Sequence, residues 1–347
     1  MRIAKSFCFA AISSIALAAC GGSGNTAQGA RDFVRGVGSS TLYPFATAVA
    51  EATAKAGGKS PVIESTGTGA GMKLFCAGVG AAHPDIENAS RRIKASEYEE
   101  CKKNGVTEIV EIQVGIDGIA FAEAKQGPGM ALTPVDVYKA LAANPFGKPN
   151  TAKLWKDVNP SLPAIPITVY GPPTTSGTRD ALAELILTKG CETDPAMKAL
   201  KDSDKDKHKA YCTEVREDGA YVDAGENDNL IVQKISQNPK AIGIFGFSFL
   251  EENMDKLKGV SMSGIEPTYQ TISDFSYPGA RPLYIYVKAA HLKAIKGLSD
   301  YVAEWVKAWG AQGYLKQKGM VIAPDDIRAK NADIAAKMTP LDPTTLK

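Results

Sequence analysis

Gly171-Pro172-Pro173-Thr174-Thr175-Ser176-Gly177-Thr178-Arg179-Asp180 is a loop rich in hydroxyl groups and glycine that leads directly into an apolar, helix-periodic segment at 181–187. Such a loop directs backbone N–H groups, hydroxyls and the positive end of a helix toward one point, which suits an oxyanion. Ser and Thr also stand before helices as simple N-caps, and the loop alone fits that simpler role somewhat better.

Two other segments repeat this design. Gly36-Val37-Gly38-Ser39-Ser40-Thr41-Leu42-Tyr43-Pro44 precedes an Ala-rich helical run, and Glu64-Ser65-Thr66-Gly67-Thr68-Gly69-Ala70-Gly71-Met72-Lys73 follows a strand-like piece and precedes another helix. In an open α/β sheet, the loops at the carboxyl ends of the strands converge on one crevice. The three turns together therefore predict one oxyanion site with many donors rather than three separate caps.

The first twenty residues have the pattern of a secretory signal peptide. Arg2 and Lys5 precede the apolar run 7–16, and Leu17-Ala18-Ala19-Cys20 resembles the lipobox of bacterial lipoproteins. We expect Cys20 to become the lipidated first residue of the mature chain; the alternative is ordinary cleavage at a small residue, with Cys20 incidental. Residues 21–30 are rich in Gly, Ser, Asn and Gln and predict a flexible tether between membrane and folded protein.

Four further cysteines fit an exported protein. Cys76, Cys101, Cys191 and Cys212 allow three disulfide connectivities, of which the local pairs Cys76–Cys101 and Cys191–Cys212 are favoured because each closes a short loop. No C-x-x-C pair occurs and the three histidines are isolated in the sequence, so we expect no metal site.

Composition and periodicity favour a two-lobed α/β protein. The chain has 347 residues and a formal net charge of +2, without the basic stripe or recognition motif of a nucleic-acid binder. Helical and strand-like patterns alternate along the chain. We expect helices at 45–56, 70–77, 95–104, 134–142, 178–189, 227–237, 290–309 and 325–337, and strands at 33–37, 61–65, 108–114, 118–124, 165–170, 241–245 and 281–288.

The three loops also carry a family resemblance. In this order, with the signal peptide, the block Gly225-Glu226-Asn227-Asp228-Asn229 and the following 241–246, they resemble the phosphate-binding component of the bacterial phosphate-specific ABC transporter. The resemblance implies a periplasmic-binding-protein fold of type II, with two α/β lobes joined by two crossing strands. It implies lobe 1 at 31–117 plus 278–347, lobe 2 at 118–277, and hinges near Gly115–Gly118 and Pro278–Pro282.

The same resemblance assigns phosphate-binding groups from both lobes. Donors expected from the first lobe are Thr41, the Leu42 N–H and Thr68, which matches a family serine. Those from the second lobe are Ser176, the Gly177 N–H and Thr178. The complete set of expected ligand residues is Ser40, Thr41, Leu42, Thr68, Ser90, Arg91, Ser176, Gly177, Thr178 and Arg179.

Two departures from the family pattern concern charge. Ala89-Ser90 is followed by Arg91 where well-known members have Asp, and Pro172 replaces a family Arg. A guanidinium matches two phosphate oxygens, so Arg91, or Arg179 beside Ser-Gly-Thr, is the expected cation. Arg92 fits a solvated surface charge better.

The missing Asp bears on selectivity, because a carboxylate that accepts the proton of hydrogen phosphate repels sulfate. Asp117, at the expected hinge, is a candidate for this acceptor, and a hinge residue bonded to nearby backbone is the equally favoured alternative. Glu226, Asn227 and Asp228 are expected to buttress the cradle, by orienting Arg179.

The sequence favours ligand capture over chemistry. No histidine lies in or beside the three loops to activate a serine, and no G-x-S-x-G elbow occurs there, so a phosphatase or esterase is disfavoured. We expect no cofactor and a monomer that delivers phosphate to an ABC permease in the inner membrane. The competing interpretation is a binding lipoprotein for sulfate or arsenate, or a phosphate sensor or adhesin uncoupled from transport.

Overall fold

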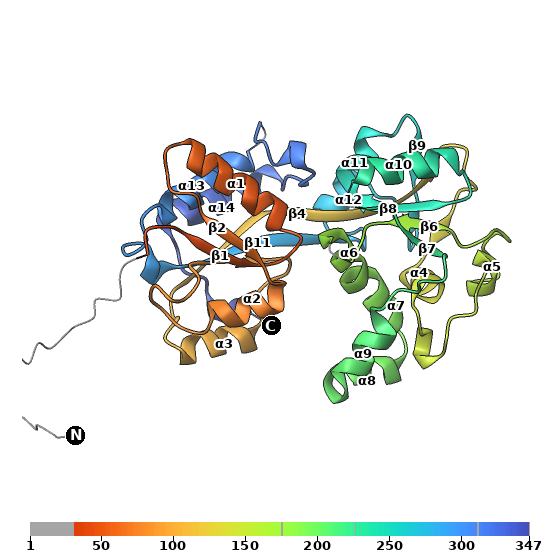
Figure 1. Ribbon diagram of the computed structural model, residues 1–347, viewed down its shortest axis with the longest axis horizontal. Coiled ribbons are helices and arrows are strands. Elements are labelled where there is room, and N and C mark those ends of the chain that lie inside the picture. The colour runs from red at the N-terminus through yellow and green to blue at the C-terminus, as the bar shows by residue number, and fades with distance from the viewer. Residues whose placement is uncertain (1–30, 175, 226, 311, 347) are drawn as a thin grey trace, which may run out of the picture.

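Two long strands, β4 (Ile109–Ala124) and β11 (Ala280–Lys288), run from one lobe into the other (Figure 1). They are antiparallel, and the pairing of Ala280 with Gly118, Arg281 with Asp117 and Pro282 with Ile116 lies between the lobes. The computed structural model describes residues 31–174, 176–225, 227–310 and 312–346. The expected signal peptide, Cys20 and the tether lie outside these residues.

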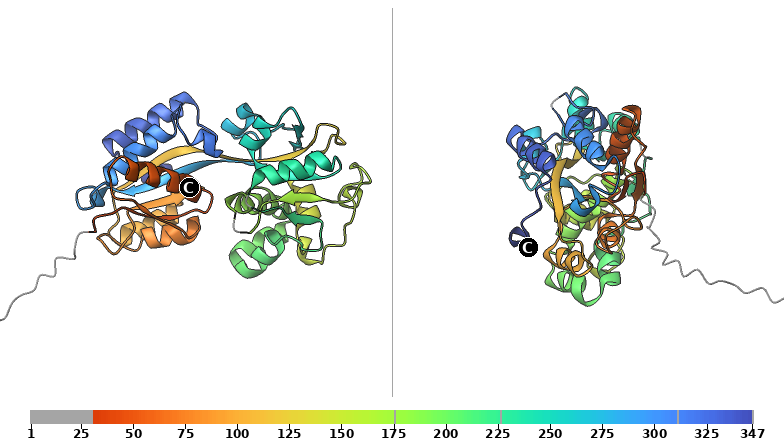
Figure 2. Two further views of the ribbon diagram at one scale, coloured as in Figure 1. Left: turned by 45° about the horizontal axis from the view of Figure 1, so that its top comes forward. Right: turned by 90° about the vertical axis from the view of Figure 1, so that its left-hand side faces the viewer.

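The first lobe is built on the strand order β2-β1-β3-β11-β4. Strands β1 (Arg35–Gly38), β2 (Val62–Ser65) and β3 (Ile86–Ala89) are parallel to one another, and β11 runs antiparallel to β3. Helices cover both faces of this sheet (Figures 1 and 2). On one face lie α1 (Tyr43–Lys55), α13 (Leu298–Ala308) and α14 (Asp325–Lys337), and on the other α2 (Thr68–Phe75) and α3 (Ala95–Lys103).

Helix α1 shows how the sequence sets this packing. Its buried residues include Ala46, Val49, Ala50 and Thr53, a spacing that places them on one helical face. Pro44 stands in the first turn, where the missing N–H costs no hydrogen bond. The buried face joins α13 and the sheet in one apolar cluster.

The second lobe continues the sheet as β4-β8-β6-β7, with β9 (Leu257–Gly259) antiparallel to β4. Strands β6 (Val169–Gly171), β7 (Tyr221–Asp223) and β8 (Ile242–Gly246) are parallel. A helical segment starts at α6 (Gly177–Ala181), passes through a π-helical stretch, Leu182–Leu187, and ends in α7 (Thr188–Cys191). The remaining elements of this lobe are α4 (Pro134–Leu141), α5 (Trp155–Val158), α8 (Pro195–Ser203), α9 (Lys205–Cys212), α10 (Asp228–Gln237), α11 (Phe247–Glu252), α12 (Tyr269–Ser273) and the short pair β5 (Ala131–Leu132) and β10 (Ser261–Met262).

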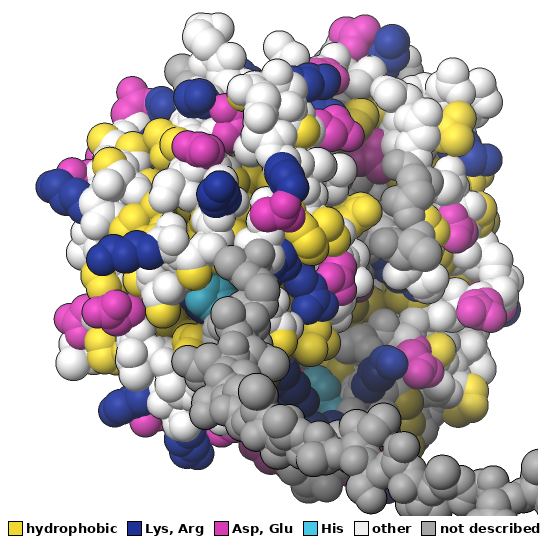
Figure 3. Space-filling model, turned by 60° about the vertical axis from the view of Figure 1, so that its left-hand side comes forward, with side chains coloured by type: hydrophobic (Ala, Val, Ile, Leu, Met, Phe, Trp, Pro, Cys, Tyr) yellow, Lys and Arg dark blue, Asp and Glu magenta, His cyan; other side chains and the backbone are white. Residues whose placement is uncertain are grey.

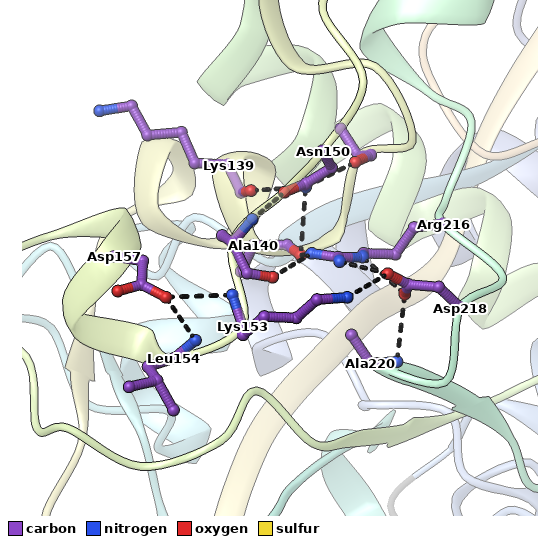
Figure 4. A network of polar contacts seen from close by, with 11 residues as sticks. Lys139, Ala140, Asn150, Lys153, Leu154, Asp157, Arg216, Asp218 and Ala220 are labelled. Carbon is purple, nitrogen blue, oxygen red and sulfur yellow. Dashed lines mark hydrogen bonds and ion pairs between the residues drawn. The ribbon is translucent and has the colours of Figure 1, made fainter.

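Covalent bonds and one polar network fix the outer parts of the lobes. The disulfides are Cys76–Cys101, which joins the end of α2 to α3, and Cys191–Cys212, which joins α7 to α9, so the favoured local connectivity is confirmed. In lobe 2, buried Arg216 donates to the carbonyls of Ala140 and Ala152 and pairs with Asp218 (Figure 4). These bonds hold the loop after α4 against the chain before β7.

The structure corrects several sequence-based expectations. The strands expected at 108–114 and 118–124 are one continuous strand, β4. The helix expected at 290–309 is a 3-10 turn, Ala289–His291, followed by α13, because Gly297 has a φ of 82° just before it.

The surface of lobe 1 mixes charges of both signs. In Figure 3, Lys and Arg side chains lie among Asp and Glu without a broad field of one sign on the visible part of this face. Within the described residues, no helix has the length and apolar character needed to cross a membrane.

Candidate anion site between the lobes

The carboxyl ends of the parallel strands in the two lobes face each other across the gap between the lobes (Figure 1). β1, β2 and β3 lead into Ser39, Thr66 and Ser90, and β6 leads into Pro172. Loops in this position carry ligands in open α/β sheets. The turns at Ser40–Thr41 and Ser176–Thr178 line one crevice between the lobes, whereas no residue of the turn at 64–73 is among its lining residues.

Two of the turns touch across the gap. The Thr41 hydroxyl donates to the carbonyl oxygen of Gly177 at 3.2 Å, and the Ser40 hydroxyl bonds to Asp180. A β-carbon on Gly177 would collide with the backbone of Thr41. Glycine at this position is therefore what allows the two loops to approach so closely.

Thr68 and Ser90 form a second pair in lobe 1. The Thr68 hydroxyl accepts from the backbone N–H of Ser90 at 3.1 Å and lies 3.0 Å from the Ser90 hydroxyl. Both side chains are buried, and Thr68 is the first residue of α2. The pair thus fixes hydroxyl groups at the positive N-terminal end of a helix.

The turn in lobe 2 is both a helix cap and a loop of the site. Ser176 is the N-cap of α6, and its hydroxyl accepts from the N–H of Thr178 at 3.2 Å. Ser176, Gly177 and Thr178 also line a crevice of about 750 Å³ that Ser40 and Thr41 line from the other lobe. The capping role and the crevice position are therefore compatible. Leu42, the N-cap residue of α1, has a fully buried side chain.

The expected cations lie outside this crevice lining. Arg91 forms a two-pronged ion pair with Glu97, with N–O distances of 2.9 and 2.7 Å, and its side chain is 31% exposed. Arg179 stacks over the Tyr221 ring at 4.2 Å and lines a neighbouring hollow of about 730 Å³. Arg92, expected on the surface, pairs with Glu111 and is partly exposed. Glu97 holds the pKa of Arg91 above its usual value, despite burial.

The sequence reasoning missed Arg281, a buried cation on the crossing strand β11. Its Nη2 donates to the Thr41 hydroxyl at 2.9 Å, its Nε donates to Asp117 at 3.0 Å, and its Nη1 bonds to Glu184. One signal was available: Arg281 lies within the expected hinge at Pro278–Pro282, at the start of a mostly apolar strand.

The acidic residues divide between hinge and crevice. Asp117 lines the crevice and pairs with Arg281. Burial raises the pKa of Asp117, the charge of Arg281 opposes this rise, and Glu184 adds to it. Asn227 and Asp228 also line the crevice, where Asn227 caps α10 and Asp228 accepts from the N–H of Gly246 at 3.3 Å. Glu226 lies outside the described residues.

The described residues lining the crevice include no histidine, and no group of three or more potential metal-ligating His, Cys, Asp or Glu side chains occurs within the described ranges. The crevice is lined by hydroxyls and the N-terminal ends of helices. The buried guanidinium of Arg281 is not itself a lining residue, but it bonds to the lining residues Thr41 and Asp117. These groups together can bind an oxyanion through charge-assisted hydrogen bonds.

Comparisons with known proteins agree with this arrangement. A match to the PBP superfamily domain covers residues 23–311. The phosphate-binding protein PstS of Staphylococcus saprophyticus is 35% identical over 83% of this chain and 81% of its own, and protein SphX of Synechococcus elongatus is 34% identical over 75% and 69%. A crystal structure described as a possible phosphate binding protein, from Planctomyces limnophilus, has a TM-score of 0.71 and 29% identity, over 88% of this chain and 98% of that one. The chain therefore belongs to the PBP superfamily, as a PstS-type substrate-binding protein.

Proposed function

We propose that this protein captures inorganic phosphate between its lobes and delivers it to an ABC permease. The observation that carries the proposal is the contact between the Thr41 and Gly177 turns beside a buried guanidinium, because it places donors from both lobes around one space. The names of the relatives, which are phosphate-binding proteins, support the choice of phosphate among the oxyanions. The relatives are binding proteins, which supports capture rather than catalysis.

The proposed binding groups come from four turns. Thr41, Ser40 and the Leu42 N–H would act from the first lobe with Thr68 and Ser90, and Ser176, Gly177 and Thr178 would act from the second. Arg91 and Arg179 remain candidate cations only if their side chains leave Glu97 and Tyr221. Closure would follow bending near Gly115–Gly118 and Pro278–Pro282, between lobes at 31–117 plus 278–347 and 118–277.

Asp117 is the proposed acceptor for the proton of hydrogen phosphate. Its second carboxyl oxygen is free to accept, because only Oδ2 bonds to Arg281 among the described contacts, and its side chain lines the crevice. Sulfate carries no proton to donate, so it would leave this buried carboxylate facing another negative charge. Discrimination against sulfate would then come from Asp117.

We also propose that the protein works outside the cytoplasm as a monomer, held to the membrane by a lipid on Cys20. The leader and tether patterns of the sequence support this placement. Labelling of cells with a palmitate analogue should mark the wild-type protein and leave Cys20→Ala unmarked. Equal labelling of the two would refute the anchor.

Isothermal titration of phosphate-stripped protein, lacking the leader and tether, tests the ligand. Phosphate should bind with a Kd of about 1 μM or tighter, which corresponds to about −8 kcal/mol, and sulfate should give little heat. Thr68→Ala should weaken phosphate at least about tenfold, because a buried charge-assisted donor is lost. Thr151→Ala, at an exposed position of lobe 2, is the matched control. Equal binding of sulfate, or selective binding of arsenate, would instead assign another oxyanion.

A further inference from the structure

Arg281 is held by two kinds of partner. Asp117 and Thr41 bind its Nε and Nη2 at 3.0 and 2.9 Å, and both are largely buried. Glu184 binds its remaining terminal nitrogen, Nη1, and the Glu184 side chain is 55% exposed. Of the two carboxylates that bind this guanidinium, Glu184 is therefore the one that is well exposed to water.

Glu184 reaches Arg281 from the opposite lobe. It lies in the π-helical stretch Leu182–Leu187, six residues beyond Thr178 of the Ser176–Thr178 cap. Arg281 lies on the crossing strand and bonds to Thr41. The negative charge of Glu184 adds to the rise that Glu97 causes in the pKa of Arg91, a candidate cation of lobe 1. It also adds to the rise that burial causes in the pKa of Asp117, the carboxylate that pairs with Arg281. A carboxylate of lobe 2 thus stands next to the positive charge that an oxyanion between the lobes would use.

We propose that Glu184 is a built-in competitor of the anion site, whose carboxylate holds the Nη1 end of Arg281 and is displaced when an oxyanion binds there. This inference rests on the proposed phosphate-binding function. It makes Arg281 the guanidinium of the site, Asp117 the residue that positions it, and Glu184 the residue that sets how tightly the anion binds.

The chemistry of the three partners favours exchange at Glu184 alone. The Asp117 side chain is only 13% exposed, so its removal from Arg281 would leave a largely buried carboxylate without its cation. Glu184 can turn into solvent, and exposed ion pairs contribute little to stability. A carboxylate and an oxyanion repel each other at one guanidinium nitrogen, so the ligand must displace Glu184 before it gains that hydrogen bond.

Titration of inorganic phosphate into wild-type protein and Glu184→Gln tests this competition. We expect the variant to bind phosphate about three- to tenfold more tightly, because the ligand no longer displaces an ion pair. Any sulfate binding should tighten by a similar factor, because Glu184 competes for Arg281 whether or not the bound anion carries a proton. Glu252→Gln removes the same charge from an exposed site of lobe 2 and should leave the Kd unchanged.

An unchanged Kd in Glu184→Gln would overturn the competition, and a weaker one would show that Glu184 positions Arg281 or accepts the proton of phosphate. Arg281→Gln gives a second arm: in this background Glu184→Gln should no longer tighten binding. Circular dichroism of each variant separates loss of binding from loss of fold. Absence of heat from wild type and Glu184→Gln with phosphate, sulfate and arsenate would refute the proposed function as well, whereas binding without a gain would refute only the competition.

Discussion

Gly177 lies where the two lobes are in contact, and a β-carbon there would collide with the backbone of Thr41. Gly177→Ala should therefore prevent full closure and weaken phosphate binding by about tenfold or more, as the lobe 2 donors no longer reach the ligand. The fold should tolerate the change, since alanine is favourable in the first turn of a helix. Titration calorimetry measures the loss.

Gly69→Ala is the control for this substitution. Gly69 lies in the first turn of α2, and a β-carbon there would meet no other atom within 4 Å. Its phosphate affinity should stay near that of wild type. Unchanged affinity in Gly177→Ala would mean that the Thr41 and Gly177 loops do not need to touch when the ligand binds.

Lys288 is a fully buried amine on β11, far from the crevice, and its behaviour should show in the pH dependence of stability. It donates to the carbonyl of Gly78 at 2.6 Å and lies over the Phe75 ring. Burial lowers the pKa of Lys288 to about 7, although the charge of Asp85 opposes this shift. At pH values between this lowered pKa and the ordinary pKa of lysine, the amine is protonated in the unfolded chain and neutral in the folded protein.

The Lys288 amine should therefore make the folded protein more stable as the pH rises from about 7 toward 10. Lys288→Met should remove this part of the slope, about 1.4 kcal/mol for each pH unit, whereas Lys293→Met at an exposed position should not. Urea unfolding at several pH values gives the comparison. Parallel pH profiles for wild type and Lys288→Met would show that the buried amine keeps its ordinary pKa.

At the level of secondary structure, the regular helices and most strands were predictable, but the crossing was misread. The glycines of Gly115-Ile116-Asp117-Gly118 read as a break between two strands, yet β4 passes through them. A β-carbon at Gly115 would meet Met320, and one at Gly118 would lie 2.8 Å from Ile272. These glycines thus permit close packing against neighbouring segments, which a local pattern does not reveal.

The other misses have the same origin in tertiary contacts. Strand β3 was not expected because it contains Glu87 and Asn88, and both are buried in the sheet. The hydroxyl-rich turns could be recognised from the sequence because their residues stand next to one another. The position of Arg281 could not be predicted this way, since its partners Thr41, Asp117 and Glu184 lie far away in the sequence.

The two disulfides clamp different elements and should differ in their effect on binding. Removal of Cys191–Cys212 by the double alanine variant should lower the free energy of unfolding by about 3 kcal/mol, and leave phosphate affinity within about twofold. Removal of Cys76–Cys101 should cost similar stability and also weaken binding, because Cys76 directly follows α2, whose first residue is Thr68. Urea unfolding and calorimetry on both variants measure this; equal affinity losses would contradict it.

For the molecule as a whole, the crossing strands join the two halves of one sheet, one half in each lobe, so one ligand between the lobes should stabilise both. Phosphate at a hundred times its Kd should raise the free energy of unfolding by about 2.7 kcal/mol. Hydrogen exchange should then slow at the start of α2 in lobe 1 and at the start of α6 in lobe 2 alike. Protection confined to one lobe would mean that the anion binds without bridging the gap. Sulfate at the same concentration is the matched control. Because sulfate has no proton for Asp117 to accept, it should not bind, and hydrogen exchange at both helices should stay as fast as without ligand.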